Sequence, residues 1–210
     1  LELVMTLFLG KTAVSPVINV GGNSDTPSVK YKLLQRVIDD SNNEIGTVSG
    51  FFTDKNDVEY AVVCLDATYR NSSAQWASTT GNVTNMPLYD NWTIWEAPET
   101  ATENTTLILA SKTSSACTHC RSKSFTIGGV TYYGQLPNII ELVDIARHRT
   151  AINAADTSGG SITIATNKNY WSSSQYNSSY SWYIEYLGRA LFGGKTGNSY
   201  VCPVLEIPLS

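Results

Sequence analysis

Charge is scarce in this sequence of 210 residues. Only 15% of the residues are Asp, Glu, Lys or Arg, and the formal net charge is -4. Such a chain offers no basic stripe to neutralise phosphates, which argues against nucleic acid as a partner. No run approaches the roughly 18 apolar residues of a membrane span, so no membrane span is expected. The low charge fits an exposed, turn-rich β protein better than a helical enzyme.

Side chains for acid–base catalysis are equally few. The two histidines are His119, in a Ser/Thr-rich loop, and His148, near the end of a predicted helix. Neither has a nucleophile or an orienting acid close in sequence. The stretch 188–196 resembles a phosphate-binding loop, but Gly188 and Gly194 lie one residue too far apart and no helix follows. We therefore expect no catalytic residue.

Cysteine occurs four times, and only one pair has a spacing that suggests chemistry. Cys117 and Cys120 are spaced as in a zinc knuckle, and Cys64 and Cys202 could on paper complete four ligands. No second paired motif supports zinc, and a loop disulfide or free buried thiols fit the sequence better. We expect no metal and no cofactor.

Turn-forming and apolar residues divide the chain into three parts. Residues 1–28 combine Pro and Gly with small polar residues, which predicts an extended arm. The arm is expected to serve attachment or assembly, and homo-oligomerisation through it stays an open alternative. Residues 29–66 hold short apolar runs separated by turns such as 54–57, which predicts a small antiparallel β meander. Residues 67–210 form the main domain, with which the meander could merge.

Long loops and a short helix are expected at the start of the main domain. Residues 67–106 are rich in turns, and Trp76, Trp92 and Trp95 are predicted to be the buried anchors of these loops. A helical pattern runs from residue 103 or 104 to about residue 112.

The strongest helix signal follows Leu136 and Pro137. Asn138 at the N-cap and Glu141 three residues later predict a capping box. Arg147 and Arg149 are expected in the C-terminal turns, where positive charge suits the helix dipole. The predicted helix packs on a sheet through one apolar face formed by Ile139, Leu142, Val143 and Ala146.

The segment 169–200 concentrates aromatic residues among Ser, Gly and Asn, which is the composition of a binding surface. If Trp182, Ile184 and Tyr186 face the core, strand alternation exposes the residues between them. The predicted solvent-facing patch consists of Tyr183, Glu185 and Leu187, joined by Arg189, Leu191 and Phe192 from the following loop. The alternative is that these aromatics fill the core of a β domain.

Three separated motifs resemble one known family. They are the helix start 136–142, the run Tyr170-Trp171-Ser172-Ser173-Ser174, and the end Val201-Cys202-Pro203-Val204. In this order they are similar to the C-type-lectin-fold variable proteins of diversity-generating retroelements, of the formylglycine-generating-enzyme-like branch. The resemblance covers roughly residues 45–210. It implies an α+β chain with a C-type lectin fold, preceded by a small N-terminal antiparallel β extension.

The resemblance also implies which residues vary. In the family, a reverse transcriptase miscopies adenines of a template, so Asn codons become many other codons within a diversified segment, here about 170–207. An Asn codon changed in this way cannot become Trp, Gln, Glu or Lys, so Trp171, Gln175, Trp182 and Lys195 are expected to be scaffold. Glu185 is then either fixed or derived from a different template codon. The implied ligand-binding residues are Tyr176, Tyr180, Tyr183, Glu185, Leu187, Arg189, Leu191, Phe192, Gly193 and Tyr200.

A non-enzymatic receptor-binding protein is the function that the resemblance implies. Its partner would be a protein or cell-surface ligand, and its location a phage tail-fibre tip or a cell surface. Two alternatives stay open on the sequence. One is a formylglycine-generating-like or glycan-active enzyme with the same fold, and the other is a structural subunit of a virion or surface.

Overall fold

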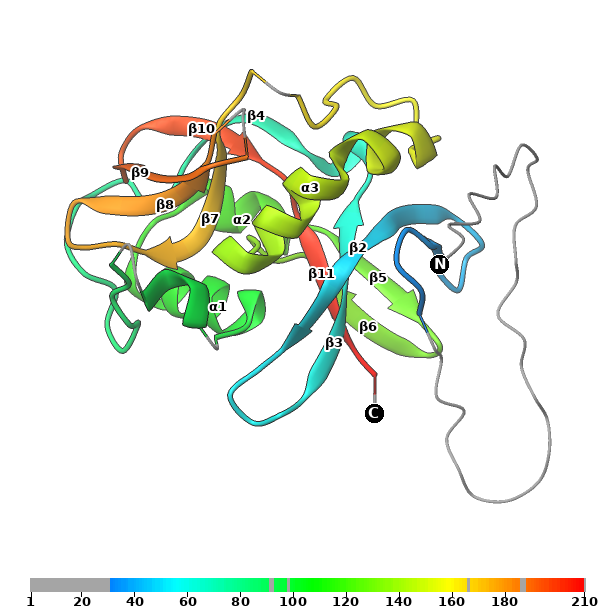
Figure 1. The fold of residues 1–210 in the computed structure, drawn as a ribbon, viewed down its shortest axis with the longest axis horizontal. Coiled ribbons are helices and arrows are strands. Elements are labelled where there is room, and N and C mark those ends of the chain that lie inside the picture. Colours follow the sequence, from blue (N-terminus) through cyan, green and yellow to red (C-terminus); the bar gives the residue numbers. More distant parts are fainter. Residues whose placement is uncertain (1–30, 91–92, 98, 166, 186–187, 210) are drawn as a thin grey trace, which may run out of the picture.

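The computed structural model describes residues 31–90, 93–97, 99–165, 167–185 and 188–209. Within these ranges the chain forms eleven β-strands and three α-helices, which confirms the predicted mixture of helix and sheet (Figure 1). The predicted arm 1–28 lies outside the described residues, as do Trp92, Tyr186 and Leu187. No helix among the described residues is long and apolar enough to cross a membrane.

The first sheet contains the predicted meander. Its strand order is β1 (Arg36–Ile38), β2 (Glu44–Thr53), β3 (Glu59–Leu65) and β11 (Val204–Pro208), and neighbouring strands are antiparallel. The predicted turn between β2 and β3 forms because Oδ1 of Asp54 accepts the N–H groups of Asn56 and Val58. Strand β11 reaches β3 from the far end of the sequence, so the meander shares its sheet with the C-terminal strand (Figure 1).

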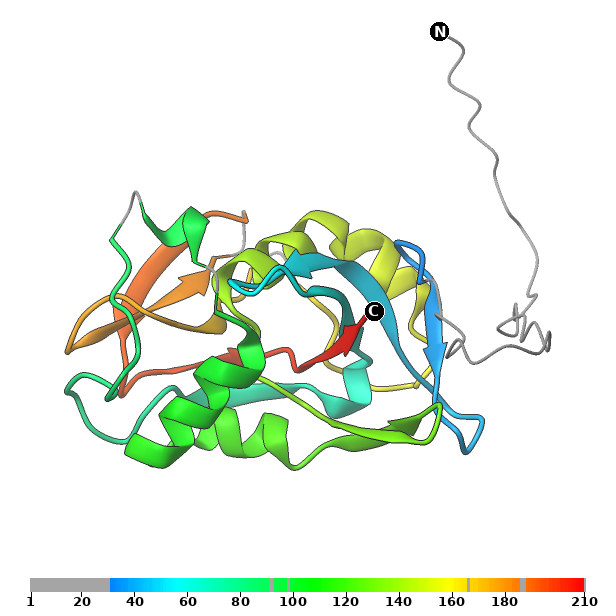
Figure 2. The ribbon, with the colours of Figure 1, turned by 90° about the horizontal axis from the view of Figure 1, so that it is seen from below.

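The second sheet carries the aromatic segment. Its order is β4 (Asn71–Gln75), β10 (Asn198–Val201), β7 (Tyr170–Gln175), β8 (Tyr180–Ile184) and β9 (Ala190–Gly194). The contact between β10 and β7 is parallel, and the other contacts are antiparallel. Figure 2 shows the two sheets at opposite ends of the long axis. Strand β9 therefore lies at an edge of the molecule, remote from the meander.

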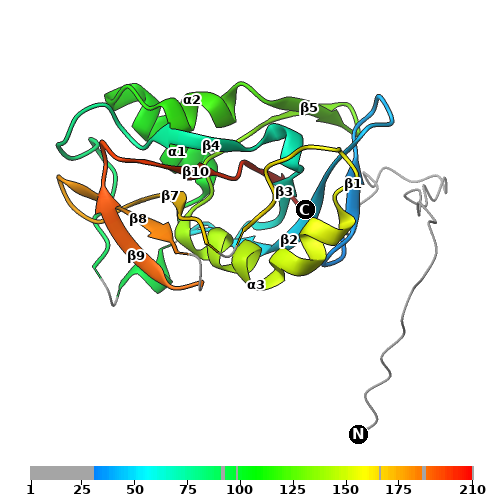
Figure 3. The ribbon, with the colours of Figure 1, turned by 90° about the horizontal axis from the view of Figure 1, so that it is seen from above.

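Helix α3 (Ile139–Ala155) packs on strands of both sheets, β2 and β3 of the first and β7 and β8 of the second (Figure 3). The predicted capping box is confirmed, since the Asn138 side chain accepts the Glu141 N–H at 2.9 Å and Glu141 accepts the Asn138 N–H at 2.8 Å. The prediction that Arg147 and Arg149 lie in the last turns was wrong. The helix continues to Ala155 because no Gly or Pro interrupts it and Ile152 is buried in the core.

The second predicted helix is confirmed as α1 (Ala101–Ser111). It begins earlier than expected because Thr100 caps it, with Glu103 completing a second capping box. Trp76 is buried as predicted, whereas Trp95 is 52% exposed. Trp95 lies on the 3-10 helix η2 (Thr93–Glu96), in which its neighbour Ile94 takes the buried position.

The expected loop around Cys117 and Cys120 is instead helix α2 (Ser115–Arg121). The Ser114 side chain caps this helix by accepting the Cys117 N–H at 3.0 Å. The three-residue spacing then places both thiols on one buried face. All four cysteines are buried and free, and burial raises the pKa of Cys117 to about 12.

The remaining elements are a short hairpin and a 3-10 helix, and the hairpin packs on the first sheet. Strands β5 (Ser124–Ile127) and β6 (Val130–Tyr133) form a hairpin, and the 3-10 helix η1 (Ala67–Tyr69) follows β3. Phe125 of the hairpin packs with β1, β2, β3 and β11 in one apolar cluster. Two further clusters lie beneath α3 and around Trp171, so the second sheet has a buried layer on each face.

Two buried carboxyl groups meet where α1 and α3 begin. Glu206 of β11 accepts the N–H groups of Ala101 and Thr102, at 2.7 and 2.9 Å, which satisfies the first donors of α1. Glu141 is fully buried, and its Oε1 has no ordinary hydrogen-bond partner. Burial, followed by the charge of Glu206, raises the pKa of Glu141 well above its usual value. Glu141 therefore holds a proton more readily in the folded protein than in the unfolded chain.

Replacing Glu141 by Gln is expected to stabilise the protein more at pH 8 than at pH 5. Because its pKa is raised on folding, Glu141 of the wild type takes up protons when the chain folds. The stability that this proton uptake contributes is complete below the ordinary pKa of 4.5, and it is lost as the pH rises through the raised folded-state pKa. A Gln side chain keeps the capping box without a proton. Urea unfolding at both pH values should show that the free energy of unfolding of the variant, relative to the wild type, is higher at pH 8 than at pH 5.

The matched control is Glu103→Gln, at the same position in the capping box of α1 but partly exposed and paired with Lys55. It should lose a little stability and show no comparable gain with pH. An equal pH response of the two variants would contradict a raised pKa of Glu141.

Candidate ligand-binding surface

Strands β8 and β9 form the hairpin on which most of the predicted binding residues lie. Trp182 and Ile184 are each only 2% exposed, as the predicted alternation required. Trp182 lies opposite Phe192, and Tyr183 lies opposite Leu191. Directly opposed residues share a face of the sheet, so the hairpin has a Trp182 face and a Tyr183 face.

The predicted single patch is therefore divided between two faces. Leu191 and Phe192 were expected in a loop, where both could join Tyr183, but they belong to strand β9. Consecutive strand residues point to opposite faces. Phe192 accordingly lies with Trp182, and Leu191 lies with Tyr183.

Four aromatic side chains form a continuous cluster on the Trp182 face, which we call the aromatic ledge: Tyr176, Tyr180, Trp182 and Phe192. Tyr176 stacks on Phe192, with ring centroids 4.2 Å apart and planes 1° from parallel. Tyr180 and Trp182 each contact Phe192 edge-on, at 5.7 and 5.9 Å. Tyr180 is 42% exposed and Phe192 39% exposed. In the aromatic ledge, Trp182 is thus buried, whereas Tyr180 and Phe192 are exposed to solvent.

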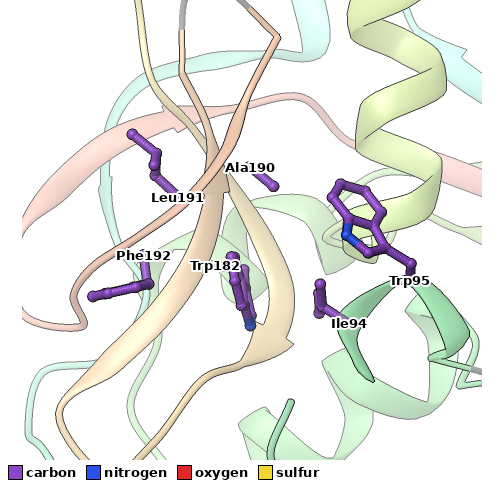
Figure 4. Close-up of a pocket in the computed structure, with 6 residues that line it drawn as sticks. All are labelled: Ile94, Trp95, Trp182, Ala190, Leu191 and Phe192. Atoms are coloured by element: carbon purple, nitrogen blue, oxygen red, sulfur yellow. The ribbon is translucent and has the colours of Figure 1, made fainter. Parts of the chain in front are cut away.

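A hollow of about 230 Å³ adjoins the aromatic ledge. Helix η2 forms one wall with Ile94 and the exposed Trp95, and the hairpin forms the other (Figure 4). The described lining side chains are all apolar or aromatic, so they can bind by apolar burial and ring contact but supply no acid, base or nucleophile. The lining residues are Ile94, Trp95, Trp182, Ala190, Leu191 and Phe192.

The Tyr183 face is less exposed than predicted. Tyr183 is half-buried and meets Trp171 edge-on, with ring centroids 5.9 Å apart. A Cβ on Gly193 would lie 3.0 Å from the Tyr183 ring, so this glycine allows the ring to pack. Gly193 was expected to contact ligand, but its position in the structure explains it as a packing residue.

Two more expected ligand contacts have other surroundings. Glu185 was predicted on the solvent face but is buried, because its carboxylate pairs with the exposed Arg189 guanidinium while its N–H binds the Arg189 carbonyl. Tyr200 is half-buried on β10, where it packs on Tyr170 at 5.5 Å. Strands β7 and β8 separate β10 from β9, so Tyr200 lies roughly 14 Å from the hairpin edge.

The four residues expected to be scaffold are all buried beneath this surface. The indole N–H of Trp182 donates to the Tyr89 carbonyl at 3.0 Å, and that of Trp171 donates to the Ala74 carbonyl at 3.0 Å. The first hydrogen bond connects the hairpin to the loop at Tyr89, and the second connects β7 to β4 within the same sheet. The indole N–H groups of both tryptophans beneath this surface therefore have hydrogen-bond partners.

Lys195 is the least expected of the four scaffold residues. Its Nζ donates to Gln175 Oε1 and, at 3.1 Å, to the Gly81 carbonyl, and it lies 4.7 Å from the centroid of the Trp76 ring. Burial, with a smaller contribution from Lys112, lowers the pKa of Lys195 to about 8. The amine is fully buried in the described structure, so we assign it a structural role that ties the β9–β10 turn to the loop at Gly81.

Sequence reasoning missed Ile94, Trp95 and Ala190 as members of the site. Trp95 was identified as an aromatic in a loop, but nothing in the sequence places that loop beside β9. Across the described ranges, no three His, Cys, Asp or Glu side chains are grouped as a metal site would need.

Comparison with known protein families gives no match for this chain. Comparison with curated proteins gives no match either.

Proposed function

We propose that the chain is a non-enzymatic binding protein, in which the aromatic ledge and the adjoining hollow receive an apolar or aromatic group of a protein or cell-surface ligand. The observation that carries this proposal is the exposure of Trp95, Leu191 and Phe192 around one hollow, with the exposed Tyr180 beside Phe192 on the aromatic ledge. Large apolar side chains gathered at one exposed place commonly mark an interaction site.

Aromatic side chains suit this role because they contribute a large contact area at low cost in conformational entropy. Here their rings are already held in place. Phe192 is fixed by stacking on Tyr176, and the Trp182 indole is fixed by its hydrogen bond to Tyr89. A ligand would therefore meet a largely pre-formed surface, which lowers the entropic cost of binding.

We further propose that the fold is of the C-type lectin type and that the chain is a variable protein of a diversity-generating retroelement. The three sequence motifs support this assignment, and the burial of the four residues expected to be scaffold, Trp171, Gln175, Trp182 and Lys195, agrees with it. The exposed Tyr180 and Phe192 would then be diversified positions. The protein would act at a phage tail-fibre tip or at a cell surface.

The triple variant Trp95→Ala, Tyr180→Ala, Phe192→Ala is expected to lose ligand binding while it keeps its fold. A ligand is first identified by screening the wild type against intact bacterial surfaces and displayed protein libraries. Each anchor should cost about 1 to 4 kcal/mol, so the triple variant should bind at least about 100-fold more weakly in a titration.

The control carries three alanines at similarly exposed apolar positions elsewhere, Leu33, Val130 and Tyr133. Its affinity should match that of the wild type. If the Trp95, Tyr180 and Phe192 variant binds as tightly as this control, the aromatic ledge is not the recognition surface.

The retroelement assignment has a separate test. Sequencing of the DNA around the gene should reveal a reverse transcriptase gene and a template repeat that matches the codons of residues 170–207. Their absence from the complete genome would refute the retroelement assignment and leave the binding proposal standing.

A further inference from the structure

Cys64 and Cys202 lie together although 138 positions separate them in sequence. Their Sγ atoms are 3.2 Å apart, and both side chains are fully buried. Cys64 belongs to β3, and Cys202 belongs to the short link between β10 and β11. The backbone holds this approach in place, because Val204 pairs with Cys64 and the Leu65 N–H donates to the Pro203 carbonyl at 3.0 Å.

A buried cation accompanies the two thiols. One terminal nitrogen of Arg70 lies 4.0 Å from the Cys64 Sγ. Two carbonyl groups hold the guanidinium there, that of Leu65 at 3.1 Å and that of Ile162 at 3.0 Å. The hydrogen bond from Cys64, and then the charge of Arg70, lower the pKa of Cys202. Cys202 is thus the more acidic of the two thiols, and the Cys64 thiol lies beside it.

The other two cysteines lack this arrangement. Cys117 and Cys120 share a helix face, but burial raises the pKa of each, and for Cys120 the neighbouring Cys117 raises it further. A thiol that holds its proton reacts poorly with oxidants. The geometry therefore singles out one reactive pair among four buried cysteines.

We propose that Cys64 and Cys202 are an oxidation site at which a peroxide forms an internal disulfide. The Cys202 thiolate attacks one peroxide oxygen, so that an S–O bond forms, the O–O bond breaks and the departing hydroxide takes up a proton to leave as water. The Cys64 sulfur then attacks the Cys202 sulfenic acid. An S–S bond forms, the S–O bond breaks, and the hydroxyl leaves as water with the Cys64 proton.

The oxidation conserves atoms and electrons, and it requires only a small movement of the two sulfur atoms. Two thiols lose two electrons in total, hydrogen peroxide gains them, and two water molecules result. Closing the sulfur distance from 3.2 Å to a bond length of about 2.05 Å needs a shift of about 1 Å. Hydrogen peroxide is close to water in size, so it can enter through small fluctuations that would exclude a larger oxidant.

The disulfide would fasten the two halves of the molecule. The link that carries Cys202 joins β10 of the second sheet to β11 of the first, and Cys64 lies in the first sheet. A bond that closes so long a loop restricts the unfolded chain strongly. The oxidised protein should therefore hold the surface-bearing sheet against the meander more firmly than the reduced protein does.

The test counts thiols in the full chain before and after treatment with hydrogen peroxide. A thiol reagent in denaturant should find four thiols before treatment and two after it, four being the number of free cysteines. Trypsin without reductant should release peptide 56–70 joined to peptide 196–210, and a reductant should separate them. The melting temperature should rise by roughly 5 to 15 °C on oxidation and return on reduction.

The variants sharpen the outcome. Cys117→Ser with Cys120→Ser should still form the linked peptides, whereas Cys202→Ala should not. The wild-type peptide map alone decides the matter should a variant fail to fold. Four thiols persisting in the treated wild type, a link between Cys117 and Cys120, or Cys202 recovered as a sulfinic acid would each overturn the proposal.

Discussion

Replacing Trp182 by alanine is expected to lower the free energy of unfolding by about 3 to 5 kcal/mol. The indole is only 2% exposed, and it packs in one buried cluster with Leu142 and Val143 of α3. Truncation would leave a cavity and would also leave the Tyr89 carbonyl without the indole N–H that it accepts at 3.0 Å. Urea denaturation followed by tryptophan fluorescence and circular dichroism gives the value.

A second tryptophan of the same hollow is the matched control. Trp95 is 52% exposed, so Trp95→Ala should change the stability by no more than about 0.5 kcal/mol. The two variants distinguish a residue that stabilises the fold from one that contacts the ligand. Trp182→Ala should mainly lower the stability, whereas Trp95→Ala should mainly lower the affinity for the ligand. Similar losses of stability at both positions would mean that helix η2 belongs to the core rather than to the binding surface.

The Arg70→Ala variant should also be strongly destabilised, by about 3 to 5 kcal/mol. The side chain is buried, its guanidinium is 3.5 Å from the Asp156 carboxylate, and it satisfies the carbonyl groups of Leu65 and Ile162. Alanine would leave a buried carboxylate and two carbonyl groups without this partner. Lysine should restore only part of the loss, because one ammonium cannot span the positions that the guanidinium fork reaches.

Arg147→Ala provides the comparison for Arg70. It removes an arginine that also pairs with an aspartate, Asp144 at 3.1 Å, but from a side chain that is 70% exposed. An exposed pair of this kind contributes about 0 to 1 kcal/mol. Urea denaturation of both variants at one ionic strength checks the difference. If the two losses were the same, the burial of Arg70 would not be what makes its interactions strong.

Local patterns in the sequence predicted those features that local interactions determine. The N-terminus of α3 could be identified because the capping box involves only Asn138 and Glu141. The alternation of Trp182 and Ile184 could be identified because strand periodicity does not depend on which strand lies next door. The meander was found in the same way, from short apolar runs divided by turns.

Features that depend on distant partners were missed or misplaced. The hollow needs η2 beside β9, and no local pattern brings Trp95 to Leu191. Glu185 reads as a solvent-facing residue in the strand, yet its ion pair with Arg189 allows its burial. Helix α2 was taken for a loop because Ser, Thr and Cys are weak helix formers, whereas the Ser114 cap and the buried thiols stabilise it.

The pairing of β11 with β3 has a consequence for how the protein is made. Cys64 of β3 pairs with Val204, so one edge of the meander has no native neighbour until a strand about 140 residues downstream has been made. At a synthesis rate of about 5 to 20 residues per second, that edge stays without its native neighbour for roughly 7 to 30 seconds. An unpaired apolar edge invites pairing with other chains during that interval. The yield of folded protein should therefore depend on translation speed and chaperone supply more than its final stability suggests.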